Sequence, residues 1–172
     1  MTHMQIRRVL AIDVRSHRVG YAVFEVPARL VDWGVKKNVE RLGAIANHLR
    51  MLQPSVVLLR RVKSGSKRDT AGARSIMHAI RSDMRKLSIP VQYLSESGLK
   101  NFFRTYGSRT KYQRASLLAV CFPELKWQLP PRRKIWKAEH LRMSIFDAVQ
   151  LGVAFLAASV DAEAIAHLLT KT

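Results

Sequence analysis

Two aspartates stand beside apolar residues, and they are the side chains of this chain best suited to chemistry. Asp13 follows the apolar residues 9–12 and precedes a basic turn, which is typical of an acid at the exit of a buried strand. Asp147 lies within the otherwise apolar stretch 145–149, which indicates a helix packed against a sheet. Because a buried carboxylate needs a partner, we expect other parts of the chain to bring one to each aspartate.

The chemistry that paired acids support is metal-dependent hydrolysis of a phosphodiester, since Mg²⁺ prefers carboxylate and water ligands. Most of the other acids lie in predicted helices or turns, where a solvated or capping role is expected. On a helix, His140, Ser144 and Asp147 form a nearly straight stripe, and Glu139 lies roughly 80° round the axis from Asp147. Either Glu139 or His140 could share a site with Asp147. The alternative is that Asp147 only accepts hydrogen bonds from Arg142 or a backbone turn.

The charge balance indicates a polyanionic partner. The chain has 30 Lys and Arg against 12 Asp and Glu, a formal charge of +18 and a pI near 11.1. Nucleic acid is the first candidate, because phosphate neutralisation supplies most sequence-independent affinity. An anionic membrane surface or ribosomal packing is the alternative. The candidate phosphate-binding residues in predicted loops and helix starts are Arg15, Lys63, Lys67, Arg68, Arg109, Lys111, Arg132, Arg133 and Lys134.

Three aromatic residues could stack on unpaired bases: Tyr106, Trp127 and Trp136. Burial in the core is the alternative for the tryptophans, and we expect it more for Trp127 than for Trp136. Each single Lys or Arg has its own alternative, which is a solvated surface position. The tryptophan retained as a candidate nucleic-acid contact is therefore Trp136.

Cysteine content and hydropathy indicate a reduced, non-membrane setting. Cys121 is the only cysteine, so neither a disulfide framework nor a zinc ribbon is available. The beginning of the chain lacks the apolar region of a signal peptide, and the longest apolar stretch, near 148–160, is too short to span a bilayer. We expect a cytoplasmic, nucleoid-associated protein with no membrane partner.

The elements that must position the aspartates follow from the hydrophobic pattern. Residues 9–16, 19–26 and 30–36 predict an antiparallel meander, and a helix is expected at 39–52. The continuous apolar run 55–61 is typical of a central parallel strand. The elements expected after it are a helix at 70–87, a strand at 90–94, helices at 97–105 and 111–122, an irregular stretch at 123–131, a large helix at 138–158 and a short terminal helix.

This order predicts one α/β domain over residues 1–172. Its sheet has five mixed strands, three antiparallel and then two parallel, with helices on both faces. The fourth strand ends near Arg60.

The ordered motifs resemble the RuvC-type branch of the RNase H-like superfamily over about residues 7–157. They are Ile12-Asp13 at the first strand exit, Gly20-Tyr21 opening the second strand, Arg109-Thr110-Lys111 opening a helix, and Phe146-Asp147-Ala148 in the last large helix. The basic, tryptophan-containing segment 130–136 that leads to Glu139 and Arg142-Met143 resembles a variant of that branch. The resemblance implies a homodimeric, magnesium- or manganese-dependent endonuclease that nicks Holliday junctions in DNA recombination and repair.

Two positions depart from the resembled pattern. The family places acids at the first-strand exit, the fourth-strand exit and the last helix, and Asp13 and Asp147 match the first and last as metal ligands. Arg60 stands at the fourth-strand exit, and Ser144 stands one turn before Asp147. At ~4 Å, a cation in place of an acid would repel a bound metal by several kcal/mol at intermediate dielectric.

Three arrangements of Arg60 are compatible with the sequence. Arg60 turns outward while Glu139, His140 or Asp69 completes a reduced metal site; it pairs with Asp13 or Asp147 and replaces the metal; or the alignment is displaced by a few residues. The first predicts a degenerate but metal-dependent endonuclease acting on branched or duplex DNA, with Glu139 or His140 assisting. The second predicts a catalytically inactive nucleic-acid-binding or assembly protein. An RNA-directed role is a third, weaker possibility, because charge does not distinguish RNA from DNA.

Overall fold

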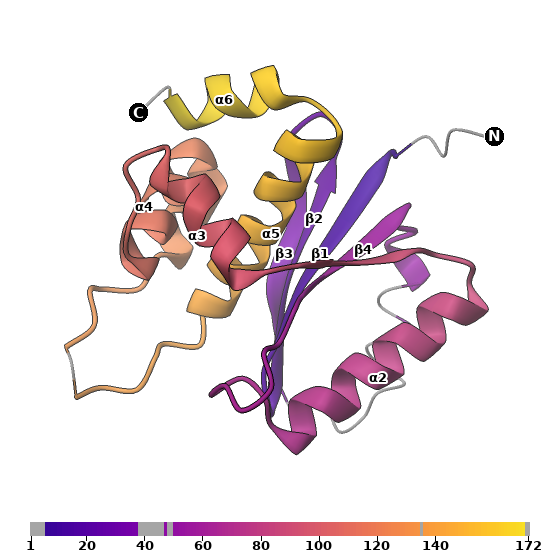
Figure 1. Cartoon of the computed structure of the whole chain (residues 1–172). Coiled ribbons are helices and arrows are strands. Elements are labelled where there is room, and N and C mark those ends of the chain that lie inside the picture. Colours follow the sequence, from indigo (N-terminus) through magenta and orange to yellow (C-terminus); the bar gives the residue numbers. More distant parts are fainter. Residues whose placement is uncertain (1–5, 38–46, 48–49, 135, 171–172) are drawn as a thin grey trace.

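A mixed five-stranded sheet divides the molecule into two layers of helices (Figure 1). The computed structural model describes residues 6–37, 47, 50–134 and 136–170, so most of the helix predicted at 39–52 lies outside the described residues. The strand order is β3-β2-β1-β4-β5, with β1, β2 and β3 antiparallel and β1, β4 and β5 parallel, which confirms the predicted sheet. The strands are β1 (Arg8–Val14), β2 (Arg18–Glu25), β3 (Arg29–Lys37), β4 (Val56–Arg60) and β5 (Val91–Leu94).

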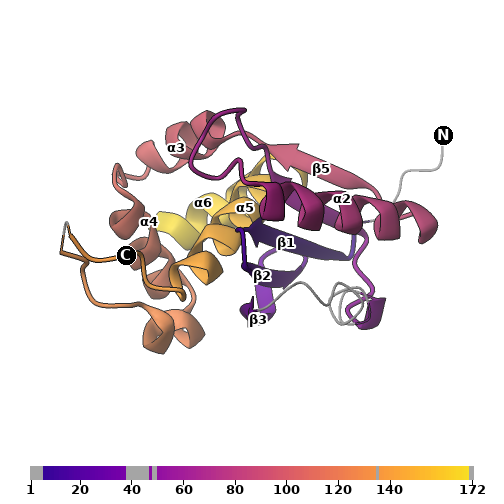
Figure 2. The same cartoon turned by 90° about the horizontal axis from the view of Figure 1, so that it is seen from below.

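Among the helices whose bounds the structure describes, one lies on one face of the sheet and the others lie on the opposite face. Helix α2 (Ala71–Lys86) covers the first face, and α3 (Glu96–Arg104), α4 (Lys111–Cys121), α5 (Met143–Ser159) and α6 (Ala162–Thr170) lie on the second (Figures 1 and 2). The stretch predicted to be irregular begins with a 3-10 helix, Pro123–Gln128. No described helix is both long and apolar enough to cross a membrane.

The alternation of side chains along β1 assigns each residue to one layer. Leu10 and Ile12 join the apolar core under α2, whereas Val9 and Ala11 join the core under α5. By the same period of two, Asp13 faces the α5 layer. Its neighbour Ile12 pairs with Leu59 of β4, so Arg60, the next residue, also reaches the α5 side at the strand exits.

Gly20 lets α5 lie close to the sheet beside Asp13. Gly20 is the register partner of Asp13 on β2, and a Cβ atom at this position would stand 2.2 Å from the backbone oxygen of Ser144. Real Cβ atoms do not approach backbone that closely, so only glycine fits here. The first turn of α5 can therefore bring Ser144 and Asp147 over the exit of β1.

Local capping places the start of α4 at the same edge. The Thr110 side chain accepts from the Gln113 backbone nitrogen at 3.1 Å, and the Gln113 side chain accepts from the Thr110 backbone nitrogen at 2.8 Å. This reciprocal capping box fixes the helix start, so that Lys111 becomes the first helical residue. The opening Arg109-Thr110-Lys111 thus begins a helix as predicted.

Two details of the sequence-based prediction are wrong. The last large helix begins at Met143 and not at 138, so Glu139 and His140 precede it in a non-helical segment. The burial expected for Trp127 is also wrong: its exposed fraction is 83%, close to the 79% of Trp136. Both indole rings are therefore available at the surface.

Candidate functional site

Asp13 and Asp147 lie together at the carboxyl ends of β1 and β4, and two arginines bridge them. Asp13 is fully buried and Asp147 is 1% exposed. Arg15 Nε lies 2.9 Å from Asp13 Oδ2, and Arg15 Nη2 lies 2.7 Å from Asp147 Oδ2. Arg68, from the loop before α2, places Nη1 2.5 Å from Asp13 Oδ1 and Nη2 3.2 Å from Asp147 Oδ2. Each guanidinium therefore binds both carboxylates at once.

Arg60 points inward, between the two aspartates. It is 4% exposed, with Nε 3.5 Å from Asp13 Oδ1 and Nη2 3.6 Å from Asp147 Oδ1. Its Nη2 also donates to the backbone oxygen of Asp147 at 3.3 Å, and Nη1 donates to Glu96 at the start of α3. Of the three arrangements compatible with the sequence, the structure has the one in which Arg60 pairs with both acids.

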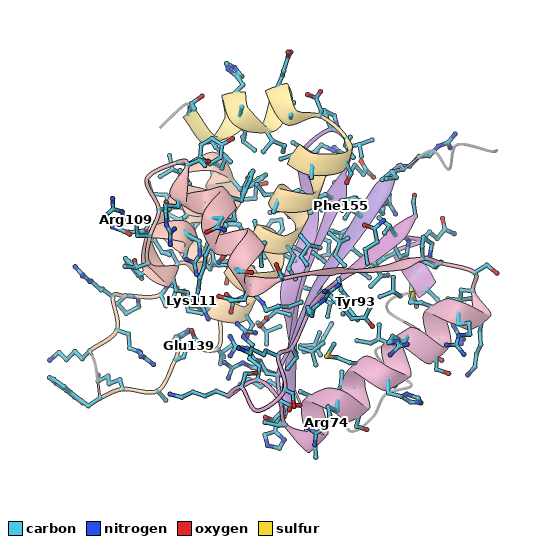
Figure 3. The ribbon with its side chains drawn as sticks, in the orientation of Figure 1. Arg74, Tyr93, Arg109, Lys111, Glu139 and Phe155 are labelled. Carbon is cyan, nitrogen blue, oxygen red and sulfur yellow. The ribbon has the colours of Figure 1, made fainter. Side chains whose placement is uncertain are left out.

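Lys111 and Glu139 complete the group, and Figure 3 shows them lying close together. Lys111 Nζ lies 2.6 Å from Asp147 Oδ2 and also pairs with Glu139. Glu139 Oε2 in turn lies 3.2 Å from Arg15 Nη2. We name eight residues of this network the ion-pair cluster and leave out Lys100, an exposed lysine of α3 whose Nζ lies 3.6 Å from Glu96 Oε1. The acids and bases of the cluster are equal in number: Asp13, Glu96, Glu139 and Asp147 against Arg15, Arg60, Arg68 and Lys111.

The electrostatics favour the charged forms of Asp147 and Arg60. Burial works against the charged form of Asp147, but Lys111, Arg60, Arg68 and Arg15 together hold its pKa well below the ordinary value. Burial likewise works against a charged Arg60, and Asp147, Asp13 and Glu96 raise its pKa above the ordinary value. Asp147 and Arg60 thus keep their charges because opposite charges lie beside them.

A divalent metal does not fit this arrangement of donors. Mg²⁺ needs several free oxygen ligands in near-octahedral geometry, and Mn²⁺ also favours oxygen. Here the oxygens of Asp13 and Asp147 accept from cationic side chains on several sides. Within the part of the chain that the structure describes, no group of three or more His, Cys, Asp or Glu side chains is placed to hold a metal.

The two proposed assisting residues have different places. Glu139 joins the cluster although it is not helical, because Lys111 and Arg15 bind its side chain. His140 is exposed, and its Nδ1 accepts from the backbone nitrogen of Arg142 at 3.2 Å. The structure thus places Glu139 beside the aspartates, whereas the described side-chain hydrogen bond of His140 is to the nearby residue Arg142.

The candidate phosphate-binding residues fall into two groups. Arg15, Arg68 and Lys111 belong to the ion-pair cluster and are only partly exposed. Figure 3 shows Arg109 pointing outward from the start of α4. Their roles in binding DNA stay predictions. The exposed members of the set are Lys63, Lys67, Arg109, Arg132, Arg133, Lys134 and Trp136.

Ser144, the second departure from the resembled pattern, also binds a cation. It is fully buried at the start of α5, and its Oγ accepts from Arg18 Nε at 3.1 Å. A hydroxyl orients the guanidinium but does not neutralise it. The positive charge of Arg18 is therefore left available to another group.

The sequence-based analysis missed Glu96 as a member of the cluster. Glu96 follows β5 directly, and β5 is parallel to β4, so its exit lies at the same edge of the sheet as Arg60. The position of Glu96 after a parallel strand could have indicated its place, because the carboxyl ends of parallel strands lie at the same edge of a sheet, where sites form. An acid just after a predicted parallel strand could have been assigned to this edge.

Comparison with known proteins identifies the fold. No protein-family model and no curated protein sequence matches the chain. Among solved structures, Thermus thermophilus RuvC is similar at a TM-score of 0.63 and 18% identity, covering 88% of this chain and 95% of that one. T. thermophilus RuvC in complex with Holliday junction substrate gives a TM-score of 0.59 and 18% identity, with 90% and 97% covered. The fowlpox virus Holliday junction resolvase gives 0.54 and 16%, with 88% and 99% covered.

Two structures of T. thermophilus RuvC and one of the fowlpox virus resolvase thus share the arrangement of this chain over nearly their whole lengths. The chain has the fold of RuvC, as the ordered motifs predicted. At these identities the likeness concerns the fold alone, so the chemistry of the site depends on this chain's own residues. Those residues are the ion-pair cluster and the cations around it.

Proposed function

We propose that this chain, which has the fold of the RuvC-type resolvases, binds branched DNA and does not hydrolyse it. The observation that carries the proposal is the ion-pair cluster. Four protein cations satisfy the two buried aspartates that the fold would otherwise offer to metal ions. The chain keeps the framework of a junction-binding nuclease while its acids are neutralised from within.

The DNA part of the proposal is supported by the distribution of unneutralised charge. The formal charge is +18, and the ion-pair cluster contributes none of this excess because its charges balance. Exposed residues carry part of this excess, among them Lys63 and Lys67 of the loop before α2 and Arg132 and Arg133 before α5. Such residues can neutralise phosphates of a strand that crosses the edge of the sheet.

Branched DNA is favoured over plain duplex by the exposed aromatic residues. Trp136 is 79% exposed, with Lys134 Nζ 5.6 Å from its ring centroid, and Trp127 is 83% exposed. Indole rings bind nucleic acid by stacking on bases that have lost a neighbour. A junction offers such bases at its centre, whereas an intact duplex offers them only at its ends.

A metal-dependent endonuclease is the second candidate function, and one observation favours it. The structure gathers three acids, Asp13, Asp147 and Glu139, around the single cation Arg15. If DNA phosphates withdrew Arg15, Arg68 and Lys111, oxygen atoms would become free for Mg²⁺ or Mn²⁺. Arg60 would still stand between the aspartates, and this is why we place hydrolysis second.

We include a homodimer in the proposal, on grounds of symmetry. A four-way junction has two-fold related arms, and a protein dimer with an isologous interface presents two equal binding surfaces to them. The exposed side of α2 carries Arg74, Arg81, Arg85 and Lys86. Light scattering of the protein with and without junction DNA measures the stoichiometry.

Binding and cleavage assays on the same substrate test the proposed function. We expect the protein to bind a labelled four-way junction more tightly than a duplex of equal length, with an affinity that falls as salt rises. We expect no product with Mg²⁺ or Mn²⁺. A product that forms with metal and disappears in Asp13→Asn would establish the endonuclease instead. Tighter binding to structured RNA than to the junction would assign an RNA-directed role.

A further inference from the structure

A cavity of about 410 Å³ opens beside the ion-pair cluster, and basic side chains dominate its wall. Arg15 and His17 come from the turn between β1 and β2, Arg18 begins β2, and Lys37 ends β3. Lys67 and Arg68 come from the loop before α2. None of the described residues that line the cavity is acidic. We name it the basic cavity.

The cations of the basic cavity differ in how their charge is balanced. Arg15 and Arg68 lie between the cavity and the ion-pair cluster, where Asp13 and Asp147 neutralise them. Arg18, Lys37 and Lys67 form no ion pair with any carboxylate of the described residues. The cavity therefore concentrates positive charge that no carboxylate of the described residues balances.

Two of these unbalanced cations are held directly opposite each other. Arg18 of β2 and Lys37 of β3 are register partners, so their side chains leave the same face of the sheet from adjacent strands. Like charges directly opposite on neighbouring strands destabilise a sheet. An anion bound between the two side chains would attract both of them and offset their mutual repulsion.

The wall of the cavity is fixed before any ligand arrives. Arg18 Nε donates to the buried Ser144 Oγ at 3.1 Å, which orients the guanidinium and leaves its two terminal nitrogens for another acceptor. The turn is held by the Arg15 nitrogen, which donates to the Arg18 oxygen at 2.9 Å, and by a 3.1 Å bond between Ser16 Oγ and Thr70 Oγ1. A ligand would therefore meet an oriented donor on a fixed turn.

We infer that the basic cavity is a phosphate-binding site in which Arg18, Lys37 and Lys67 hold one phosphate group of a nucleic acid. The inference rests on the proposed function, because it names where on that DNA-binding surface a phosphate lies. A fork of two N–H groups and two ammonium groups matches the several acceptor oxygens of a phosphate. The phosphate comes either from the continuous backbone or from a strand terminus, which adds a second negative charge.

Two pairs of neighbouring lysines supply matched variants. Lys37 lines the cavity, whereas Lys36 lies on the opposite face of β3 with Nζ 5.9 Å from the Tyr21 ring centroid. Lys67 lines the cavity, whereas Lys63 of the same loop does not. Each lysine is exposed or partly exposed at the surface, so Gln substitution should leave the fold intact. Each pair removes the same charge from nearly the same place.

The full chain is titrated with inorganic phosphate and with short DNA single strands that carry a 5′-phosphate or a 5′-hydroxyl. Two-dimensional NMR spectra recorded during each titration measure the binding. We expect phosphate to shift the resonances of the β1–β2 turn, and Lys37→Gln and Lys67→Gln each to weaken the binding of inorganic phosphate about tenfold. Lys36→Gln and Lys63→Gln should weaken this binding of inorganic phosphate less than about twofold, because neither lysine lines the cavity. Tighter binding of the 5′-phosphorylated strand assigns a terminal phosphate, and equal binding of the two strands assigns a backbone phosphate.

Equal losses in all four variants, or no shift at the β1–β2 turn, would overturn the phosphate site. Junction binding is measured separately on the same variants. If the junction binds while phosphate leaves the turn unmoved, the cavity inference fails and the proposed function stands. If phosphate binds in the cavity and the junction does not bind, the proposed function fails and the site stands as an anion site.

Discussion

The ion-pair cluster and the basic cavity share Arg15 and Arg68, yet they use positive charge in opposite ways. In the cluster each cation lies beside a buried carboxylate, and the charges balance. In the cavity Arg18, Lys37 and Lys67 have no carboxylate partner among the described residues. A formal charge of +18 therefore says little about which cations bind DNA. The cluster's cations hold the fold together, and the cavity's cations are available to a ligand.

Removing the charge of Arg60, the cation between the two aspartates, should give the largest loss in the free energy of unfolding. Arg60→Leu leaves Asp13 and Asp147 with one cation fewer in a buried site, and breaking a buried pair costs about 3–5 kcal/mol. Urea denaturation followed by circular dichroism measures the loss. Lys37→Leu is the matched change in the cavity and should alter stability by less than about 0.5 kcal/mol. Equal effects of the two changes would erase the distinction between the regions.

Reversing the charge at the same position should convert the cluster into a metal site. Arg60→Glu adds an acid where the resembled family has one, and we expect Mn²⁺ to raise the stability of this variant by about 2.7 kcal/mol when its concentration is 100 times the dissociation constant. The wild type should show no such rise. Thermal denaturation with and without Mn²⁺ compares the two proteins. A rise of equal size in the wild type would show that its cations do not exclude the metal.

Acid should weaken the cluster through Asp147. Its pKa is lowered in the folded state, so its contribution to stability is present above the unfolded value of about 3.9 and is lost as pH falls towards the folded pKa. We expect Asp147→Asn to be less stable than the wild type near pH 6 and to lose less stability on going to about pH 3. Urea denaturation across this range measures both slopes. If the stability of the wild type and of Asp147→Asn fell equally with pH, Asp147 would not contribute to the loss of stability in acid.

Substitutions of the adjacent residues Lys67 and Arg68 should have the smallest effects, and the two effects should differ in kind: one on stability and the other on DNA binding. Arg68 binds both aspartates, whereas Lys67 faces the cavity. We expect Arg68→Gln to lower stability by about 1–3 kcal/mol and Lys67→Gln to leave it unchanged. Lys67→Gln should instead weaken junction binding a few-fold and reduce the salt dependence by about one charge. Anisotropy titrations at several salt concentrations and urea denaturation separate the two effects.

The sheet could be predicted from the sequence because it follows from local patterns in a fixed order, whereas the pairing of the two aspartates was implied by the family resemblance. Apolar runs with a period of two place Asp13 on the α5 face, and the antiparallel strands are joined by short turns. The apolar surroundings of Asp147 indicated burial, which the structure has. The inward position of Arg60 was one of three possibilities, because a strand exit alone does not say where a long side chain points.

The partners in the cluster could not be predicted, because they depend on contacts distant in sequence. Arg68 and Lys111 have the same local surroundings as solvated basic residues, and only the three-dimensional fold brings them to Asp147. The start of α5 was misplaced for a similar reason. Residues 138–142 have adequate helix propensity, but the ion pairs of Glu139 with Lys111 and Arg15 hold this segment in another conformation.

Manganese binding by the junction-bound wild-type protein tests most directly whether protein cations have replaced the metal. Electron paramagnetic resonance counts bound Mn²⁺ in complexes of the junction with the wild type and with Asp13→Asn. We predict the same count for both, because the oxygens of Asp13 are held by Arg15, Arg60 and Arg68. One additional Mn²⁺ per chain in the wild type, lost in Asp13→Asn, would contradict this account and restore the site as a metal centre.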